Sequence, residues 1–169
     1  DLSKGNQPFY DARKKIGVFC NGEIYNHKLL RQDLEKKNYI FKTNSDCEVI
    51  LHGYIEYGLD FLKKINGMFF LIIWKDEEQK IILARDRMGE KPCYYTRKNN
   101  NIFFSSEIKP LLKNNNIQKT LNFNSIDFFL NNRYVPSSNN LIKEIATLEP
   151  GTLLEISEKI FKKIKYWDF

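Results

Sequence analysis

Three consecutive residues, Asn21, Gly22 and Glu23, carry groups that acyl-transfer chemistry uses. Asn21 supplies a side-chain amide donor, and Gly22 has no side chain to shield its backbone N–H. Two such donors aimed at one point can form an oxyanion hole, which stabilises the charge of a tetrahedral intermediate. The carboxylate of Glu23 could hold a cationic group beside them. The same residues also fit an ordinary Asn-Gly turn, and without further context that plainer interpretation is favoured.

A second acidic residue, Asp46, lies at the predicted start of a helix. Ser45 and Glu48 have the spacing of a capping box, in which Ser caps the helix and Glu follows three residues later. The helix macrodipole favours an acid in the first turn and holds it in place. Asp46 is therefore either a helix-start acid or a ligand for an amine, and the local pattern leaves both open.

A strand and a helix are predicted on the two sides of Asn21-Gly22-Glu23. Residues 15–20 form an apolar run of strand length, so the three polar residues are expected to form a turn at its end. Asn26 can cap the helix that follows, over about residues 27–37. The predicted unit is a strand, a short polar turn and a helix.

The capping box is expected to open a second helix that ends at Gly58. Apolar side chains on that helix recur at the 3.6-residue period and predict one buried face. The residues predicted on this face are Ile50, Leu51, Tyr54 and Ile55. A short helical turn over residues 60–64 and a turn at Asn66-Gly67 are expected to follow.

The second half of the chain is dominated by predicted strands. Four segments of strand length are bounded by turn residues: 68–74, 81–85, 93–97 and 102–105. Short polar loops join the first to the second and the third to the fourth, so these neighbours should pair antiparallel. Two short helices and a closing hairpin are expected at 108–112, 125–130, 152–156 and 161–166. Many strands with a few separate helices indicate an α+β fold, and residues 1–169 are predicted to form a single domain.

The charge of the chain does not indicate nucleic-acid binding. The net charge is +6, from 27 Lys and Arg against 21 Asp and Glu. The lysines are spread along the sequence and mixed with acids, whereas a nucleic-acid site concentrates them and adds aromatic side chains that stack on bases. We therefore expect no nucleic-acid partner.

Metal binding and membrane insertion are also not expected. The three cysteines, Cys20, Cys47 and Cys93, have no CxxC spacing, and the two histidines have no metal-binding partner pattern. The longest apolar run, residues 68–74, falls far short of the roughly 20 residues that span a bilayer. No signal peptide is present at the start, so the cytoplasm is the expected location.

Several ordered blocks of this sequence resemble the glutaminase domain of asparagine synthases (glutamine-hydrolysing). The three longest are residues 21–26, 45–52 and 83–92, in the order and at about the spacing of that family. Shorter matches lie at Asp1-Leu2-Ser3, 7–8, 66–69, 105–109, 134–136, 150–151 and 166–168. Together the matches cover essentially the whole chain, and so many ordered blocks are far more specific than any one of them.

The resemblance implies a class II glutamine amidotransferase with an N-terminal-nucleophile fold, a four-layer αββα sandwich of two antiparallel sheets. It implies that Asn21 and the N–H of Gly22 form the oxyanion hole, and that Glu23 and Asp46 hold the α-amino group of glutamine. In that family the N-terminal Cys attacks glutamine, and the ammonia passes to a synthetase domain that activates aspartate with ATP. The Arg85-Asp86-Arg87 block and Lys91 are expected to have a structural or interdomain role.

The nucleophile of the family has no match in this chain, because residue 1 is Asp. The family's Arg that binds the glutamine carboxylate also has no match, and Arg13 does not correspond to it. Cys47 lies at a helix start, where the dipole could activate a thiol, but none of the three cysteines is a convincing replacement. The chain is therefore expected to be an N-terminally truncated piece of the domain, with an incomplete sheet and no activity by itself.

The leading interpretation is a part of an asparagine synthase, with glutamine and a C-terminal synthetase domain of the same polypeptide as partners and a homodimer of the full protein. No cofactor is expected in this domain, because ATP and magnesium belong to the absent synthetase domain and no Gly-rich phosphate loop occurs here. Two alternatives stay open. One is a non-catalytic glutaminase-like binding module, and the other is an amidotransferase of the same family with a different acceptor.

Overall fold

The computed structural model describes residues 5–136 and 139–168. The Asp1-Leu2-Ser3 match lies outside the described residues. The chain divides into two compact units, one made of Asp1–Lys91 and Gly151–Phe169 and the other of Pro92–Pro150. The prediction that residues 1–169 form one domain stays a prediction.

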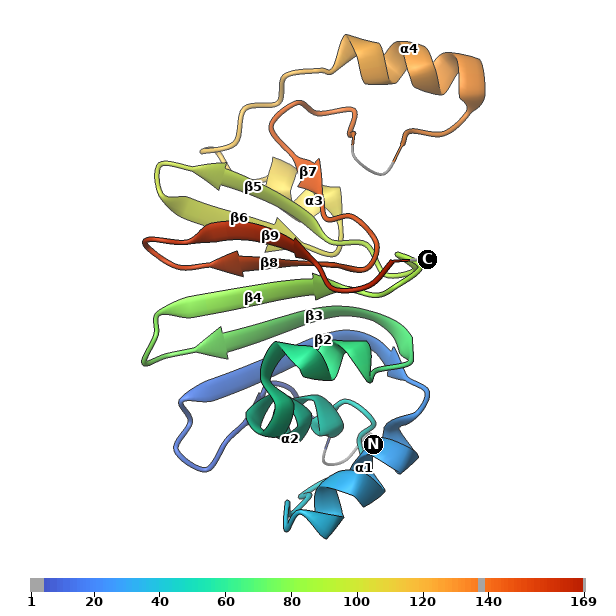
Figure 1. Ribbon diagram of the computed structural model, residues 1–169. Helices are drawn as coiled ribbons and strands as arrows, with labels where there is room; N and C mark the ends of the chain where they lie inside the picture. Colours follow the sequence, from blue (N-terminus) through green and yellow to red (C-terminus); the bar gives the residue numbers. More distant parts are fainter. Residues whose placement is uncertain (1–4, 137–138, 169) are drawn as a thin grey trace. The chain divides into compact units, whose positions relative to one another are not determined.

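The first unit is built on a six-stranded sheet (Figure 1). Every neighbouring pair of strands in it is antiparallel, in the order β1-β2-β3-β4-β8-β9. The strands are β1 (Phe9–Tyr10), β2 (Ile16–Ile24), β3 (Gly67–Lys75), β4 (Lys80–Arg85), β8 (Thr152–Ile156) and β9 (Phe161–Lys165). The last two strands come from the end of the chain, so the sheet joins residues from both termini.

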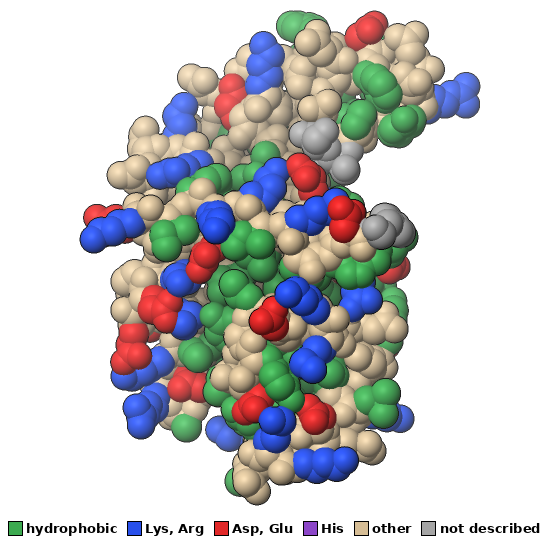
Figure 2. Space-filling model, in the orientation of Figure 1, with side chains coloured by type: hydrophobic (Ala, Val, Ile, Leu, Met, Phe, Trp, Pro, Cys, Tyr) green, Lys and Arg blue, Asp and Glu red, His purple; other side chains and the backbone are tan. Residues whose placement is uncertain are grey.

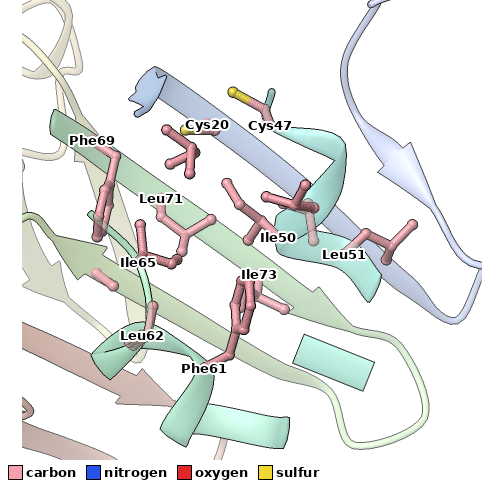
Figure 3. Packing of buried hydrophobic residues seen from close by; sticks show 14 of the residues in the cluster. Cys20, Cys47, Ile50, Leu51, Phe61, Leu62, Ile65, Phe69, Leu71 and Ile73 are labelled. Carbon is pink, nitrogen blue, oxygen red and sulfur yellow. The ribbon is translucent and has the colours of Figure 1, made fainter. Parts of the chain in front are cut away.

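Helices pack on one face of this sheet and form the main core with it. They are α1 (His27–Lys36), α2 (Glu48–Tyr57) and the 3-10 helix η1 (Gly58–Lys63). Figure 3 shows Ile50 and Leu51 of α2 together with Leu71 and Ile73 of β3 in this core. The fully buried Phe61 of η1 closes the same cluster.

The second unit has a smaller sheet and a smaller core. Its strands are β5 (Tyr94–Lys98), β6 (Asn101–Ser105) and β7 (Ala146–Thr147), in the order β6-β5-β7 with antiparallel pairs. Its helices are α3 (Ile108–Leu112) and α4 (Phe123–Asn132). Leu111, Ile117 and Ile145 are the buried residues of this core.

The predicted α+β fold with antiparallel sheets is confirmed. The strands expected at 68–74, 81–85 and 102–105 are β3, β4 and β6, and the closing hairpin is β8–β9. The two short helices are α3 and α4. Among the described residues, no helix combines the length and apolar character needed to cross a bilayer.

The turn expected at Asn21-Gly22-Glu23 is wrong. These residues are extended and belong to β2, where they pair in register with Phe70, Phe69 and Met68 of β3. An Asn-Gly pair favours a turn locally, but the adjacent strand fixes an extended backbone here.

Both predicted helix caps are also wrong. The Asn26 side chain does not cap α1; instead, its Nδ2 donates to Lys64 O and its Oδ1 accepts from Asn66 N, each at 2.9 Å. Helix α2 begins at Glu48, after Cys47, without a side-chain cap. The predicted end at Gly58 is confirmed, but Ile55 is 41% exposed and does not lie on the buried face.

Surface charges of both signs are mixed on the face seen in Figure 2, where Lys and Arg side chains alternate with Asp and Glu. Charged side chains of the chain also form ion pairs, such as Lys37 with Glu56 and Lys80 with Glu155. This face has no single basic patch of the kind that binds a phosphate backbone.

Candidate functional site

The direction of each peptide in β2 alternates along the strand, as in any β-strand. Tyr25 N donates to Asn66 O, on the side of β3, at 2.8 Å. Cys20 N and Ile24 N point the other way, to the outer edge, and donate to side chains of Gln7 and Asp46 at 2.5 and 2.8 Å. Gly22 lies between Cys20 and Ile24 in the same phase, so its N–H also points to the outer edge.

Only glycine fits at position 22 because β3 passes very close to it. A Cβ at Gly22 would lie 2.0 Å from the backbone O of Met68 and 2.7 Å from Cα of Phe69. Both are backbone atoms of a paired strand, which cannot move aside as a side chain would. The close approach of β3 therefore requires glycine at position 22, and glycine has no side chain that could shield its own N–H.

The side chains of Asn21 and Glu23 lie on one face of β2, opposite to the face that packs on the core. Both are exposed, whereas Cys20 and Ile24 on the other face are buried. Within residues 5–136 and 139–168, neither side chain has a hydrogen-bond partner. The Asn21 amide and the Glu23 carboxylate are thus available to a ligand at the end of β2 as far as the described residues are concerned.

Asp46 lies beside the same strand end, although it is 22 residues away from Ile24 in the sequence. Its Oδ2 accepts the hydrogen bond from Ile24 N at 2.8 Å, and the side chain is half-buried. Its Oδ1 accepts no hydrogen bond from the part of the chain that the structure describes. The structure therefore places the Asp46 carboxylate at the strand end that carries Asn21-Gly22-Glu23, and its role as a ligand stays a prediction.

A buried carboxylate, Glu48, holds the segment that carries Asp46. It is 3% exposed and accepts hydrogen bonds from Lys42 N, Thr43 N and Thr43 Oγ1 at 2.7 to 2.8 Å. Burial by itself would raise the pKa of the Glu48 carboxyl, but these hydrogen bonds outweigh burial and lower the pKa. Thr43 Oγ1 accepts from Ser45 N at 3.0 Å and so passes the constraint on toward Asp46.

Arg31 of α1 supports the same segment through the backbone of Thr43. Its Nη2 donates to Thr43 O at 2.6 Å, and its guanidinium lies 4.2 Å from the ring centre of Phe41. Sequence reasoning missed Arg31, Thr43 and the role of Glu48. The Ser45-x-x-Glu48 pattern was a signal for Glu48, but it pointed to a different hydrogen-bond partner.

The three cysteines are free thiols, and each is at most 6% exposed. Cys20 and Cys47 lie beside each other at the end of the core (Figure 3). A hydrogen bond with the Cys47 thiol and burial both raise the pKa of Cys20. Cys47 Sγ is 4.0 Å from Gly22 O and 3.6 Å from Asp46 Oδ2. The burial of all three supports the expectation that none replaces the nucleophile.

The Arg85-Asp86-Arg87 block has the structural role that was expected for it. The Asp86 carboxylate is fully buried and accepts hydrogen bonds from four backbone N–H groups, those of Phe69, Met88, Glu90 and Lys91. The Arg85 guanidinium donates to the carbonyl oxygens of Gly89 and Lys91. In the described residues no group of three or more His, Cys, Asp or Glu could hold a metal ion.

Residues 1–167 match the family model of the glutamine amidotransferase domain, and the chain belongs to that family. Among curated proteins it is similar to asparagine synthetase (glutamine-hydrolyzing) 2 of Bacillus subtilis, with 38% identity over 99% of this chain and 23% of that protein. It is also similar to asparagine synthetase (glutamine-hydrolyzing) 2 of Arabidopsis thaliana, with 42% identity over 66% of this chain and 19% of that protein. The resemblance to the glutaminase domain of asparagine synthases is thus confirmed.

Solved structures agree on the fold. The glutamine phosphoribosylpyrophosphate amidotransferase from B. subtilis, solved with ADP and GMP, has a TM-score of 0.66 at 20% identity. That likeness covers 95% of this chain and 32% of the other, and it assigns the N-terminal-nucleophile amidotransferase fold. The chain spans only about a quarter of the length of the first curated relatives, 23%, 24% and 28%.

Proposed function

We propose that this chain forms the glutamine-receiving part of a glutamine-hydrolysing amidotransferase. Asn21 and the N–H of Gly22 act as the oxyanion hole, and Glu23 and Asp46 hold the α-amino group of glutamine. The observation that carries the proposal is the pattern of hydrogen bonds along the outer edge of β2. Side-chain groups occupy that edge at Cys20 and at Ile24, and within residues 5–136 and 139–168 no group accepts a hydrogen bond from the N–H of Gly22 between them.

The chemistry of these groups suits an amide substrate. The carbonyl oxygen of an amide gains negative charge when a nucleophile attacks it, and two preorganised donors stabilise that charge. The ammonium group of an amino acid needs carboxylates near it. Asp46 uses one oxygen to bind Ile24 N, which leaves the other oxygen for the ligand.

The proposal assigns binding and oxyanion stabilisation to these residues, and not the attack itself. Cys20, Cys47 and Cys93 are buried, and their amines are part of peptide bonds, so none has the free α-amine that this mechanism uses as its base. Residues 1–169 alone are therefore proposed to be inactive in ammonia release.

The whole polypeptide is proposed to be an asparagine synthase that makes asparagine from aspartate, ATP and glutamine. The support is that relatives several times longer than this chain are named asparagine synthetase (glutamine-hydrolyzing). A synthetase domain of the same polypeptide would then receive the ammonia, and ATP and magnesium would bind there. The three free thiols fit the proposed cytoplasmic location, and a homodimer of the full protein is part of the same proposal.

A different acceptor is the second candidate. The amidase chry2 of Gibberella zeae is 40% identical to this chain over 66% of it, and so a relative with another name is nearly as similar. The acceptor would be selected outside residues 1–169, so the glutamine site described here is common to both candidates.

Calorimetric titration with L-glutamine tests the proposed site. The Asp46→Asn variant keeps an oxygen for Ile24 N but loses the negative charge that faces the ammonium group. A hydrogen bond to a charged group contributes about 1.5–3 kcal/mol, so we expect glutamine affinity to fall roughly tenfold or more. The proposal is wrong if the wild-type chain takes up no glutamine, or if Asp46→Asn leaves the affinity unchanged.

Asp60→Asn is the matched control for this titration. Asp60 is exposed, pairs with Lys63 at 2.7 Å and lies in η1, and its substitution changes the net charge by the same amount. We expect it to bind glutamine like the wild type. An equal loss in both variants would trace the effect to overall charge and not to the site.

A further inference from the structure

Gln7 occupies an unusual place at the outer edge of β2. Strand β1 pairs with β2 at Phe9–Val18 and Tyr10–Gly17, and the same register would place Gln7 opposite Cys20. At that position the side chain of Gln7, and not its backbone, makes both hydrogen bonds. Its Nε2 donates to Cys20 O at 2.8 Å, and its Oε1 accepts from Cys20 N at 2.5 Å.

A glutamine side chain can replace a strand in this way because its amide has the donor and acceptor of a peptide group. The backbone of residues 5–8 is not part of a strand, so the pairing of β1 with β2 goes no further toward Gly22. A backbone that continued the ladder would lie along the outer edge and cover the N–H of Gly22. The side chain of Gln7 satisfies the Cys20 peptide and ends the ladder there.

We infer that Gln7 is a positioning residue for the oxyanion hole, an inference that rests on the proposed function of the site. Gln7 holds both the N–H and the C=O of Cys20, which belong to the peptide groups before and after that residue. Fixing these two groups orients the peptide that follows them, which carries the N–H of Gly22. Asp46 holds the same edge of the strand two residues beyond Gly22, at Ile24 N. The Gly22 N–H is thus kept between two side-chain anchors, fixed in direction and without an acceptor from the described part of the chain.

Fixed direction matters because an oxyanion hole works only when its donors point to the position that the oxygen will occupy. The anchors differ in chemical type, one a neutral amide and the other a carboxylate. Only the neutral amide can both donate and accept, and only such a group can satisfy both polar atoms of Cys20. Glutamate at position 7 has the same shape but would direct an oxygen at the Cys20 carbonyl.

The Gln7→Glu variant tests this inference, with Gln32→Glu as control. Gln32 is exposed on α1, has no hydrogen bond within the described residues, and its substitution changes the charge equally. Amide NMR spectra are recorded with and without L-glutamine. In the wild type and in Gln32→Glu, glutamine should shift the Gly22 amide signal. In Gln7→Glu this shift should be lost, and glutamine affinity should fall roughly tenfold, as expected when an uncharged donor becomes a repelling acceptor.

Amide hydrogen exchange in the wild type supplies a second measurement that needs no variant. Cys20 N–H should be protected by Gln7, and Gly22 N–H should exchange at least about tenfold faster because none of the described residues accepts its hydrogen bond. Gln7→Ala, which adds no charge, should open Cys20 to exchange and also lose the glutamine-induced shift of Gly22. It replaces Gln7→Glu if that variant does not fold.

The outcomes separate this inference from the proposed function. If the wild type takes up glutamine and the Gln7 variants show the same Gly22 shift and affinity, the inference is wrong and the proposed function stands. Equal protection of Gly22 and Cys20 in the wild type also overturns it. If glutamine neither binds nor shifts any amide in the wild type, the proposed function fails, and the role of Gln7 in it fails with it.

Discussion

Asn21, Gly22 and Glu23 are consecutive, and the strand sends their polar groups in different directions. The side chains of Asn21 and Glu23 leave one face of β2, and the N–H of Gly22 leaves its outer edge. An extended backbone achieves this because side chains and peptides alternate at right angles to each other. A tight turn would have crowded the same groups, and so the extended conformation suits a site that must surround an amide from two sides.

At the scale of the residue, Gly22→Ala is expected to be strongly unfavourable. The new methyl group would meet the backbone of β3, and forcing extra volume into a packed position typically costs about 1–3 kcal/mol. Urea unfolding measures this cost. Gly17→Ala in the same strand is the control, because the atoms nearest to its Cβ would belong to the side chains of Tyr10 and Trp74, at 3.0 to 3.4 Å. Equal stabilities of the two variants would show that β3 can move away from β2.

At the scale of the element, the start of α2 depends on the segment before it and not on a local cap. Glu48 reaches back to the backbone of residues 42–43, and Thr43 connects it to Ser45. The capping-box pattern implies a hydrogen bond from Ser45 N to Glu48, and the observed backbone donors, Thr43 and Lys42, lie two and three residues before Ser45. The segment 42–46 is thereby fixed by buried polar contacts, and Asp46 is presented at its end.

Thr43→Val removes one hydroxyl from this network and keeps the shape of the side chain. It takes a donor from Glu48 and leaves Ser45 N without its acceptor, so the free energy of unfolding should fall by about 1–2 kcal/mol. Glutamine affinity should fall as well, because Asp46 is held less firmly. Thr43→Ser keeps the hydroxyl and should restore both quantities. A Ser variant as weak as the Val variant would point to the methyl group instead.

Local patterns in the sequence predicted most elements of the fold. They predicted few of the contacts that form the site. Strands such as β3 and β4 were predictable because their apolar runs and polar hairpin loop are neighbours in the sequence. The pairing of Gln7 with Cys20 was not predictable, because it depends on which groups two strands bring together. Asp46 was placed at the site by family resemblance, since nothing local indicates that it will meet Ile24.

At the scale of the molecule, the first unit is closed by the end of the chain. Strand β8 pairs with β4, and Tyr166 Oη donates to Arg85 O at 2.7 Å. Gly151 N donates to Asp86 O at 2.9 Å, so the buried Asp86 ties the returning chain to β4. The sheet that carries the candidate site therefore depends on residues 151–168, which lie far from the site in the sequence.

His52 of α2 and the charged groups that act on it make the stability of the first unit depend on pH. Burial lowers the pKa of His52 below its ordinary 6.5, although Glu48 lies 3.7 Å away and opposes the shift. The positive charges of Lys42 and Arg31 also disfavour protonation of the His52 ring and lower its pKa. Because the folded state binds this proton less readily than the unfolded state, stability is fully present above pH 6.5 and is lost as the pH falls through the folded pKa of His52.

Thermal melts at several pH values between 8 and about 4.5 measure this dependence. The wild-type melting temperature should be level above pH 6.5 and should fall on acidification below it. His52→Gln should lower the melting temperature at neutral pH, because it loses ring contacts with Tyr39 and Phe41, but should flatten the fall between pH 6.5 and 4.5. Below pH 4.5 both proteins should lose stability together as Glu48, whose pKa is lowered in the folded state, takes up its proton. Parallel curves for the two proteins between pH 6.5 and 4.5 would mean that His52 is not the group that titrates.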